Sequence, residues 1–280
     1  IKAYDRNPAT KLIEDFMLMA NETVAEDYYW QELPFEYRTH DNPDQDKIEN
    51  LTMFIRNFGL FLRPSQEETH PKELQKVLER IEGESYEALI SKMMLRSMKQ
   101  ARYSTECTGH FGLACKYYCH FTSPIRRYPD LQIHRIIKEN LHGELTQKRI
   151  NHYRKILPGV ADDNSQKERR AEEAERDVIK LKEIEYMSEH IGEEFEGTVS
   201  GVTSGFIYVE LDNTVEGAVS VAHMHDDYYY FSEEQYAMIG QNSGRKYQLG
   251  DRVLIKVLNC NKIKKTIDFS IIDGNIEGTE

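Results

Sequence analysis

The sequence predicts an α+β protein in which a mostly helical part precedes a small β-barrel of about five strands. Apolar residues recur at helical spacing through roughly the first 190 residues, whereas short alternating strands follow Gly192. A long charged helix separates the two patterns and marks a boundary. We therefore expect a helical part over residues 1–190, a barrel over 191–275 and a tail over 276–280.

The composition is that of a folded, soluble chain. Of its 280 residues, 39% are hydrophobic and 30% charged. No apolar run approaches the ~20 residues that a membrane span needs, and no signal-peptide pattern opens the chain, so we expect no membrane contact and a cytoplasmic location. The four cysteines are expected to be reduced. A net charge of −12 opposes nonspecific coating of nucleic acid but leaves room for a local basic channel.

Proline and glycine delimit the expected helices. Asn7-Pro8 and Asn42-Pro43 each combine an N-cap with a first-turn proline, and apolar residues follow every three or four positions. Another helix is expected from Pro71 to near Gly83, with one more around Leu89 and Met93.

Two further helices complete the first part. One begins at about Pro129, and the long charged helix runs from about Ser165 to His190. Its narrow apolar stripe consists of Ala174, Val178, Leu181 and Ile184. The charged run ERRAEEAERD, residues 168–177, is most simply a solvated face with charge pairs four residues apart.

The strands after Gly192 fit an OB-type barrel. In GFIYVEL, residues 205–211, the aliphatic residues alternate with Phe206 and Tyr208, which should face outward. Further strands are expected at 216–221, 253–258 and 267–271. Exposed rings close to cations suit single-stranded RNA, because bases stack on the rings while phosphates meet the charges. The alternative is that a neighbouring domain covers the rings. The candidate cations are Arg245, Lys246, Arg252, Lys256, Lys262, Lys264 and Lys265.

The segment HFTSPIRRYPDLQIHR, residues 120–135, presents two arginines from a stiff loop. Pro124 and Pro129 restrict the backbone on either side of Arg126 and Arg127. The arginines precede a helix N-terminus, whose amides carry partial positive charge, so the loop could hold a phosphate. Residue types alone favour equally a structural ion pair with one of the many carboxylates.

Two metal sites can be imagined, and neither is favoured. Cys115 and Cys119 lie near His110 and His120, but the short cysteine pair of a zinc site does not recur in the chain. The run DNPDQD, residues 41–46, groups three aspartates that are better explained as acids at a helix N-terminus: Asp41, Asp44 and Asp46.

Several ordered motifs resemble the ribonuclease II superfamily of exoribonucleases, and within it the bacterial ribonuclease R family. YSTECTGHFGLACKYYCHFTSPIRRYPDLQIHR, residues 103–135, looks like the superfamily signature. IEDFMLMANETVAE (13–26), PFEYRTHDNPD (34–44) and ERRAEEAERDV (168–178) match its other blocks. The barrel segments FEGTVSGVTSGFIYVEL, EGAVSV, DDYYYF and LGDRVLIKV are similar to its C-terminal RNA-binding barrel.

The resemblance implies a processive exoribonuclease that degrades RNA from its 3′ end to nucleoside monophosphates with a Mg²⁺-activated water. It implies that residues 1–190 are the later part of an RNB catalytic domain. Arg126 matches an arginine placed against the scissile phosphate, a task that suits its permanent charge and two-pronged fork. Glu14 matches an acid that contacts the terminal nucleotides, and Glu175 matches a position near the exit of the RNA channel. Without the resemblance, Glu14 is an ordinary first-turn acid and Glu175 part of a solvated face.

The family's metal-binding aspartates belong to a block N-terminal to every motif quoted above. The resemblance therefore implies the C-terminal portion of such an enzyme, which binds single-stranded RNA weakly, holds no metal and does not cleave alone. Self-association through exposed apolar surface is a further expectation. Two alternatives remain open: a noncatalytic RNA-binding or scaffold protein, and a metal-dependent hydrolase built on the three aspartates of DNPDQD.

Overall fold

The computed structural model describes residues 7–62, 69–84, 86–233 and 235–274. Its backbone forms two compact units. We call the first the helical unit, made of residues within 5–79 and 94–172, and the second the barrel unit, made of residues within 80–93 and 173–280. The expected tail, residues 276–280, lies outside the described residues. An α+β fold with helices first and a barrel second is confirmed.

Helix α1 (Pro8–Trp30) begins where the Asn7-Pro8 pair predicts it. The Asn7 side chain accepts a hydrogen bond from the Thr10 amide at 3.0 Å, and the Thr10 hydroxyl accepts one from the Asn7 amide at 3.1 Å. This reciprocal cap satisfies amides that the first helical turn leaves without partners. The buried residues of α1 lie in its second half: Asn21, Ala25 and Tyr28.

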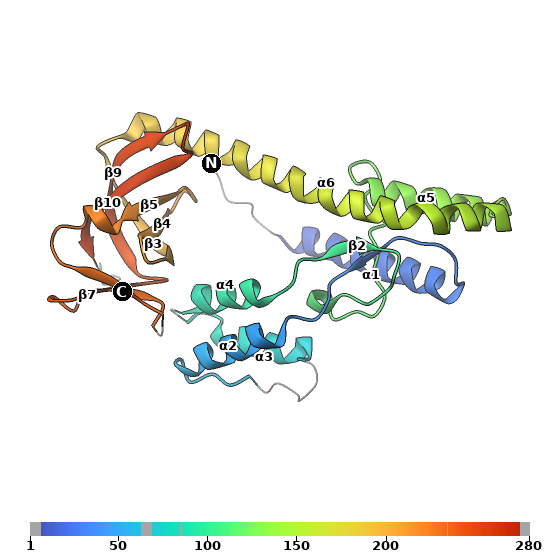
Figure 1. Cartoon of the computed structure of the whole chain (residues 1–280), viewed down its shortest axis with the longest axis horizontal. Helices are drawn as coiled ribbons and strands as arrows, with labels where there is room; N and C mark the ends of the chain where they lie inside the picture. The colour runs from blue at the N-terminus through green and yellow to red at the C-terminus, as the bar shows by residue number, and fades with distance from the viewer. Residues whose placement is uncertain (1–6, 63–68, 85, 234, 275–280) are drawn as a thin grey trace. The chain divides into compact units, whose positions relative to one another are not determined.

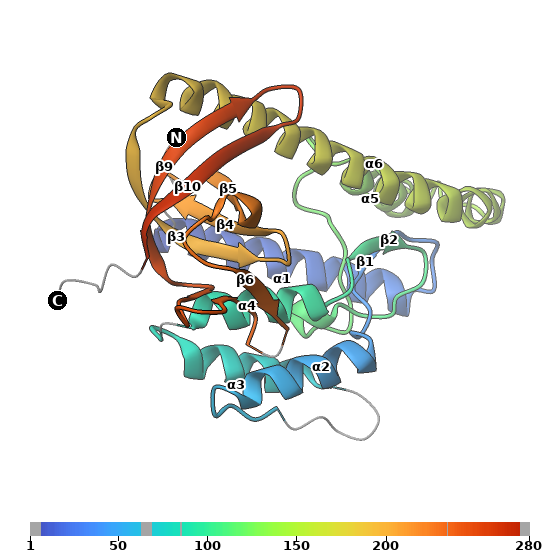
Figure 2. The same ribbon diagram turned by 60° about the vertical axis from the view of Figure 1, so that its left-hand side comes forward.

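Three helices follow: α2 (Gln45–Arg56), α3 (Pro71–Ile81) and α4 (Glu87–Ser97). Helices α2 and α3 lie side by side (Figures 1 and 2). The start predicted for α2 at Asn42-Pro43 was wrong by two residues, because Asp44 keeps an extended backbone and takes the N-cap position. The Asp44 carboxylate pairs there with Lys99 at 2.8 Å, which fixes the start of the helix.

A short antiparallel pair of strands, β1 (Tyr37–Thr39) and β2 (Arg102–Ser104), crosses the helical unit. Neither strand was predicted, because three residues are too few to show an alternating pattern. The pair lies beside the core of this unit, in which rings and aliphatic side chains pack together. The buried core residues are Ala25, Tyr28, Phe35, Tyr37, Cys119, Ile133, Ile136, Tyr153 and Leu157.

Helix α5 (Tyr128–Leu141) starts within one residue of its predicted position. It runs beside the first part of α6 (Gln147–Met187), as Figures 1 and 2 show, and the two helices are joined where Arg149 and Tyr153 both contact Glu139. The predicted start of the long helix at Ser165 was wrong by 18 residues. Pro158 lies inside α6, where burial of Leu157 and Ala161 sustains the helix.

Five strands close into the predicted barrel, in the order β10-β5-β4-β3-β9. They are β3 (Glu194–Val202), β4 (Phe206–Leu211), β5 (Glu216–Ser220), β9 (Arg252–Asn261) and β10 (Thr266–Gly274). Neighbouring strands pair antiparallel except β10 with β5, which pair in parallel. Ile207, Val209 and Leu211 are buried in the barrel, so the predicted inward face of β4 is confirmed.

A second, three-stranded sheet in the barrel unit was not predicted. It consists of β6 (Tyr229–Ser232), β7 (Ala237–Gly240) and β8 (Lys246–Gln248), which are again too short for a clear period. The end of α6 adds Ile184 and Met187 to the barrel core. Of the apolar stripe predicted on this helix, Ile184 is buried, whereas Ala174 and Val178 are exposed.

Candidate nucleic-acid interface

A tight turn presents the two arginines of the helical unit. The amides of Arg126 and Arg127 donate to the carbonyl of Ser123, at 3.3 and 3.1 Å. The Ser123 amide in turn donates to Asp130 Oδ1 at 2.7 Å, and Asp130 is fully buried in the first turn of α5. The helix therefore fixes the backbone of the turn that precedes it.

The two arginines have different surroundings. Arg127 Nη2 donates to Asp130 Oδ1 at 2.8 Å, and its side chain is only 17% exposed. Arg126 is exposed, and among the described residues no carboxylate pairs with it. The sequence left two alternatives open, a structural ion pair and a cation that could hold a phosphate. Arg127 forms the structural ion pair, and Arg126 is the available cation.

Side chains from α1 and α5 hold the start of the same loop. The buried Asn21 side chain accepts hydrogen bonds from the amides of Phe121 and Thr122, at 3.0 and 3.2 Å. His134 on α5 contacts the Phe121 carbonyl at 2.8 Å, and its ring stacks on that of Phe121 with centroids 4.4 Å apart. Because the loop is fixed at both ends, Arg126 projects from a rigid base.

A polar network adjoins the loop. The Tyr103 hydroxyl contacts His120 Nδ1 at 2.9 Å and donates to Glu168 at 3.3 Å, while Arg38 pairs with the other oxygen of Glu168. Burial and the charges of Arg127 and Arg38 lower the pKa of His120 to about 2, so its ring is neutral at physiological pH.

Sequence reasoning missed this network. Its members come from three distant segments, and Glu168 was assigned to a solvated face although its side chain is only 26% exposed. Tyr103 and Glu168 each lie inside a quoted motif, but only the fold shows that they meet.

Glu36, which precedes β1, is a buried acid with an exposure of 2%. Its Oε1 accepts a hydrogen bond from Asn164 at 2.7 Å, whereas its Oε2 is buried without a partner among the described residues. Burial raises the pKa of Glu36 to about 7, against the Asn164 hydrogen bond that lowers it, and the charge of Asp130 raises it further. Near neutral pH this group is therefore partly protonated.

The other predicted residues of the helical part are more scattered. Glu14 is half-buried in the second turn of α1, and Glu175 is exposed on α6 in the barrel unit. The solvated surface expected for Glu175 from residue types is thus what the structure has.

The barrel brings two of its predicted residues together. Phe206 is 44% exposed on β4 and Tyr208 half-buried two residues on, with ring centroids 6.3 Å apart. Arg252 on β9 is bound to the carboxylates of Asp212 and Glu196, at 2.8 and 3.0 Å. Lys256 is half-buried on the same strand and, in the part of the chain that the structure describes, forms no ion pair.

Other cations of the barrel unit form salt bridges with carboxylates. Arg245 pairs with Asp226 at 3.0 Å, and Lys265 with Asp177 at 2.5 Å. The basic patch that the sequence suggested is therefore partly neutralised, whereas Lys256 and the exposed Lys264 form no ion pair among the described residues.

The three aspartates of DNPDQD serve separate structural contacts. Asp41 accepts from Thr108 at 3.2 Å and lies 3.4 Å from Arg102, Asp44 pairs with Lys99, and Asp46 is in the first turn of α2. Among the described residues, no three His, Cys, Asp or Glu side chains are grouped so that they could hold a metal ion. These residues do not fit the family's metal.

All four cysteines are free thiols. Cys119 is buried, and burial raises the pKa of Cys115 to about 12, so these thiols stay protonated. Within the described ranges, no helix has the length and apolar character that a bilayer span requires.

Comparisons with known proteins match both parts of the chain. The RNB domain model matches residues 1–143, and the S1 RNA binding domain model matches residues 189–272. Ribonuclease R 1 of Lactococcus lactis is 40% identical over 99% of this chain and 34% of its own length. Ribonuclease R of Thermotoga maritima is 41% identical over 97% of this chain and 38% of its own length. The chain thus spans little more than a third of these relatives.

A solved structure agrees with these matches. Mycoplasma genitalium RNase R in complex with ribose methylated single-stranded RNA superposes with a TM-score of 0.87 at 27% identity. The match covers 96% of this chain and 42% of that one.

Proposed function

Because the chain belongs to the RNB family, in which its curated relatives are ribonucleases R, we propose that the protein is a 3′-to-5′ exoribonuclease that hydrolyses RNA to nucleoside monophosphates. Its partners would be 3′ ends of single-stranded RNA, its metal Mg²⁺, and its compartment the cytoplasm, where the four free thiols would stay reduced. The family part would extend over residues 1–190 and the RNA-binding barrel over 191–275.

The observation that carries the proposal is the exposed Arg126 on a rigid turn. Asp130 neutralises Arg127 and orders the turn, so Arg126 remains as the cation available to an anion. Its guanidinium can donate two hydrogen bonds to one phosphate, and the backbone of the turn does not have to be ordered on binding. We assign Arg126 to the scissile phosphate and Arg127 to holding the turn beside the RNA.

The rings of β4 would bind further along the strand. Phe206 and Tyr208 offer two stacking faces, and Lys256 offers a cation for a backbone phosphate. Arg252 would have to exchange Asp212 or Glu196 for a phosphate, so its contribution should be small at high salt. Glu14 would accept hydrogen bonds from the terminal ribose, and Glu175 would line the exit of the channel.

The chain's described residues do not fit a metal cluster, so we propose that the Mg²⁺-binding aspartates lie outside these 280 residues. The isolated chain should then hold RNA without cutting it. Its exposed apolar residues on α1 would favour self-association.

The proposal is tested by incubating the chain with 5′-labelled single-stranded RNA, once with magnesium and once with chelator. We expect binding but no shortening in either lane. Arg126→Ala should weaken binding about tenfold and flatten its salt dependence by about one unit, because one phosphate contact is lost. Arg56→Ala, an exposed arginine at the end of α2, is the matched control and should bind normally.

Two results would contradict this assignment. Equal binding by Arg126→Ala and Arg56→Ala would remove Arg126 from the site. Magnesium-dependent shortening of the RNA that persists through purification would place a metal site within the chain. The aspartates of DNPDQD would then be the first candidate ligands.

A noncatalytic RNA-binding protein is the competing function, favoured by the commitment of Asp41 and Asp44 to basic partners. It predicts that a longer protein containing this chain binds RNA with the same affinity in magnesium and in chelator and never shortens it.

A further inference from the structure

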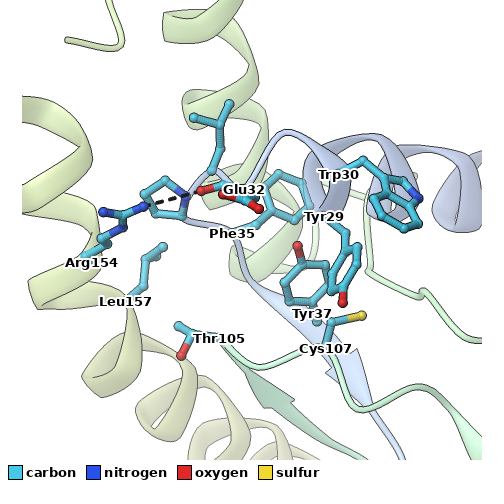
Figure 3. A pocket seen from close by; sticks show the side chains of 11 residues that line it. Tyr29, Trp30, Glu32, Phe35, Tyr37, Thr105, Cys107, Arg154 and Leu157 are labelled. Carbon is cyan, nitrogen blue, oxygen red and sulfur yellow. Dashed lines mark hydrogen bonds between the residues drawn. The ribbon is translucent and has the colours of Figure 1, made fainter. Parts of the chain in front are cut away.

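A pocket of about 510 Å³ lies in the helical unit, where the end of α1, the start of β1 and the first half of α6 meet (Figure 3). Its volume lies within the range of small-molecule sites. None of the residues that line it belongs to the arginine turn, residues 123–127. The pocket is therefore a separate feature, for which the proposed nuclease function has no use.

Aromatic side chains form one wall. Tyr29 and Trp30 meet edge to face with ring centroids 5.5 Å apart. Trp30 is 68% exposed and Tyr29 is 41% exposed, so these rings are available at the pocket mouth. Such a wall suits a flat, unsaturated ring, which stacks without needing a particular hydrogen-bond pattern.

The hydroxyl of Tyr37, a residue whose ring is buried, points into the same space. Tyr37 is only 4% exposed, and its hydroxyl has no hydrogen-bond partner among the described residues. Figure 3 shows this hydroxyl directed into the pocket rather than into the core. Burial raises the pKa of Tyr37, so the group stays a donor. The hydroxyl is thus free to donate a hydrogen bond to an acceptor on a ligand.

Charged groups lie at the opposite end. Arg154 on α6 donates one long hydrogen bond, 3.4 Å, to the carbonyl of Glu32, and in the described part of the chain it forms no ion pair (Figure 3). Glu32 is held just after α1, where its amide donates to the Tyr29 carbonyl at 3.0 Å. The pocket thus offers a guanidinium for an anion and a carboxylate for hydroxyl groups.

We propose that this pocket binds a nucleotide: the base against Tyr29 and Trp30, with the Tyr37 hydroxyl donating to its edge, the ribose hydroxyls at Glu32, and the phosphate at Arg154. Rings, a carboxylate and a guanidinium match the three parts of a nucleotide in one pocket of suitable volume. The nucleotide can be free or part of an RNA strand, since the chemistry that recognises it is the same.

Trp30 is the sole tryptophan of the chain, so its fluorescence reports on this pocket alone. We would titrate the 280-residue chain with AMP and, separately, with a five-nucleotide oligoadenylate, and correct for light absorption with free tryptophan. Saturable quenching is expected. Tyr37→Phe, which removes only the hydroxyl, should weaken binding about fivefold, and Arg154→Gln about tenfold. Lys155→Gln, the exposed neighbouring cation on α6, is the matched control and should change little.

Quenching by AMP identifies a free nucleotide as ligand, and quenching by the oligonucleotide alone identifies a nucleotide within a strand. Either result supports nucleotide binding in the pocket if Tyr37→Phe and Arg154→Gln lower the affinity measured by quenching. Absence of saturation with both ligands, or equal affinity of Tyr37→Phe and the parent chain, would overturn the inference. Arg126→Ala separates the two proposals: it should leave the Trp30 signal unchanged while weakening RNA binding.

Discussion

At the scale of single residues, the arginine turn depends on charges that are buried behind it. Asp130 is fully buried and neutralised by Arg127, but its second oxygen has no partner among the described residues. Glu36 also has an unpartnered buried oxygen and is electrostatically coupled to Asp130. Burial of the Glu36 carboxyl is the main reason that its pKa is raised, and the charge of Asp130 adds to the effect.

The raised pKa of Glu36 makes the stability of the folded state depend on pH. The folded pKa of Glu36 is about 7 against 4.5 for the ordinary group, so between these values the folded state binds more protons than the unfolded state. The contribution of Glu36 to the free energy of unfolding is fully present below about pH 4.5. It is lost as the pH rises through 7, and the loss amounts to about 3 kcal/mol. Glu36→Gln should consequently melt several degrees above the parent at pH 8 and close to it at pH 4.5.

Thermal melts across pH 4.5–8 check this expectation, with the exposed Glu106→Gln as control. A parent and Glu36→Gln that melt with the same pH profile would show that Glu36 does not titrate in this range.

Sequence reasoning reached the arginine turn because its determinants are local: two prolines, two arginines and a following helix. It could not divide the roles of Arg126 and Arg127, since that depends on which arginine Asp130 engages. Tyr37 was missed entirely. An unpartnered hydroxyl is a property of packing, and no spacing in the sequence signals it.

At the scale of elements, α1 carries an unusual number of exposed apolar side chains. Those in its first half are Leu12 at 55%, Ile13 at 57%, Phe16 at 61% and Met19 at 68% exposure. Helical periodicity predicts the helix but cannot tell which of its apolar side chains remain uncovered. A contiguous apolar surface on a helix favours contact with another molecule or segment.

We expect the isolated chain to self-associate through this stripe. Light scattering should give a mass that exceeds 32.8 kDa and rises with concentration. Phe16→Ser combined with Met19→Ser should restore the monomer mass. Leu141→Ser on α5, which is 78% exposed, is the control and should leave association unchanged. A parent chain that stays at the monomer mass over the whole concentration range would refute this expectation.

Helix ends were predicted well where capping residues determine them and poorly where burial does. Asn7-Pro8 marked the start of α1 because the cap is a local interaction. The start of α6 was predicted too late, at about Ser165, and the burial of Leu157 and Ala161 explains why the helix extends through Pro158.

At the scale of the whole molecule, two cores are separate in composition and in sequence. The core of the helical unit includes Ile133, and that of the barrel unit includes Ile184 from the end of α6. The two cores share no residue, although α6 contributes Leu157 to one and Ile184 to the other, so we expect the two units to unfold as separate cooperative blocks.

Calorimetry should therefore resolve two transitions. Ile184 is 0% exposed, so Ile184→Ala should lower the unfolding free energy of the barrel unit by about 2–5 kcal/mol and shift its transition to lower temperature. The transition of the helical unit should not move. Ile133→Ala should have the converse effect. A single transition lowered equally by both substitutions would instead mean that the chain unfolds as one block.

The barrel was predictable as a whole because alternation in residues 206–211 and the later strands fixes which faces are buried. The sheet formed by β6, β7 and β8 was not, because its strands are three or four residues long and their pairing is set by tertiary contacts. Fold class follows from long periodic segments, whereas short strands depend on their neighbours.

Closure of the barrel also bears on the colloidal behaviour of the protein. Since β10 pairs with both β9 and β5, the barrel has no terminal strand whose amides and carbonyls another chain could extend into a shared sheet. The outer strands of the small sheet, β6 and β8, span only four and three residues. Association of this chain should thus proceed through side-chain contacts such as those of α1, and the resulting assemblies should dissolve on dilution rather than mature into fibrils.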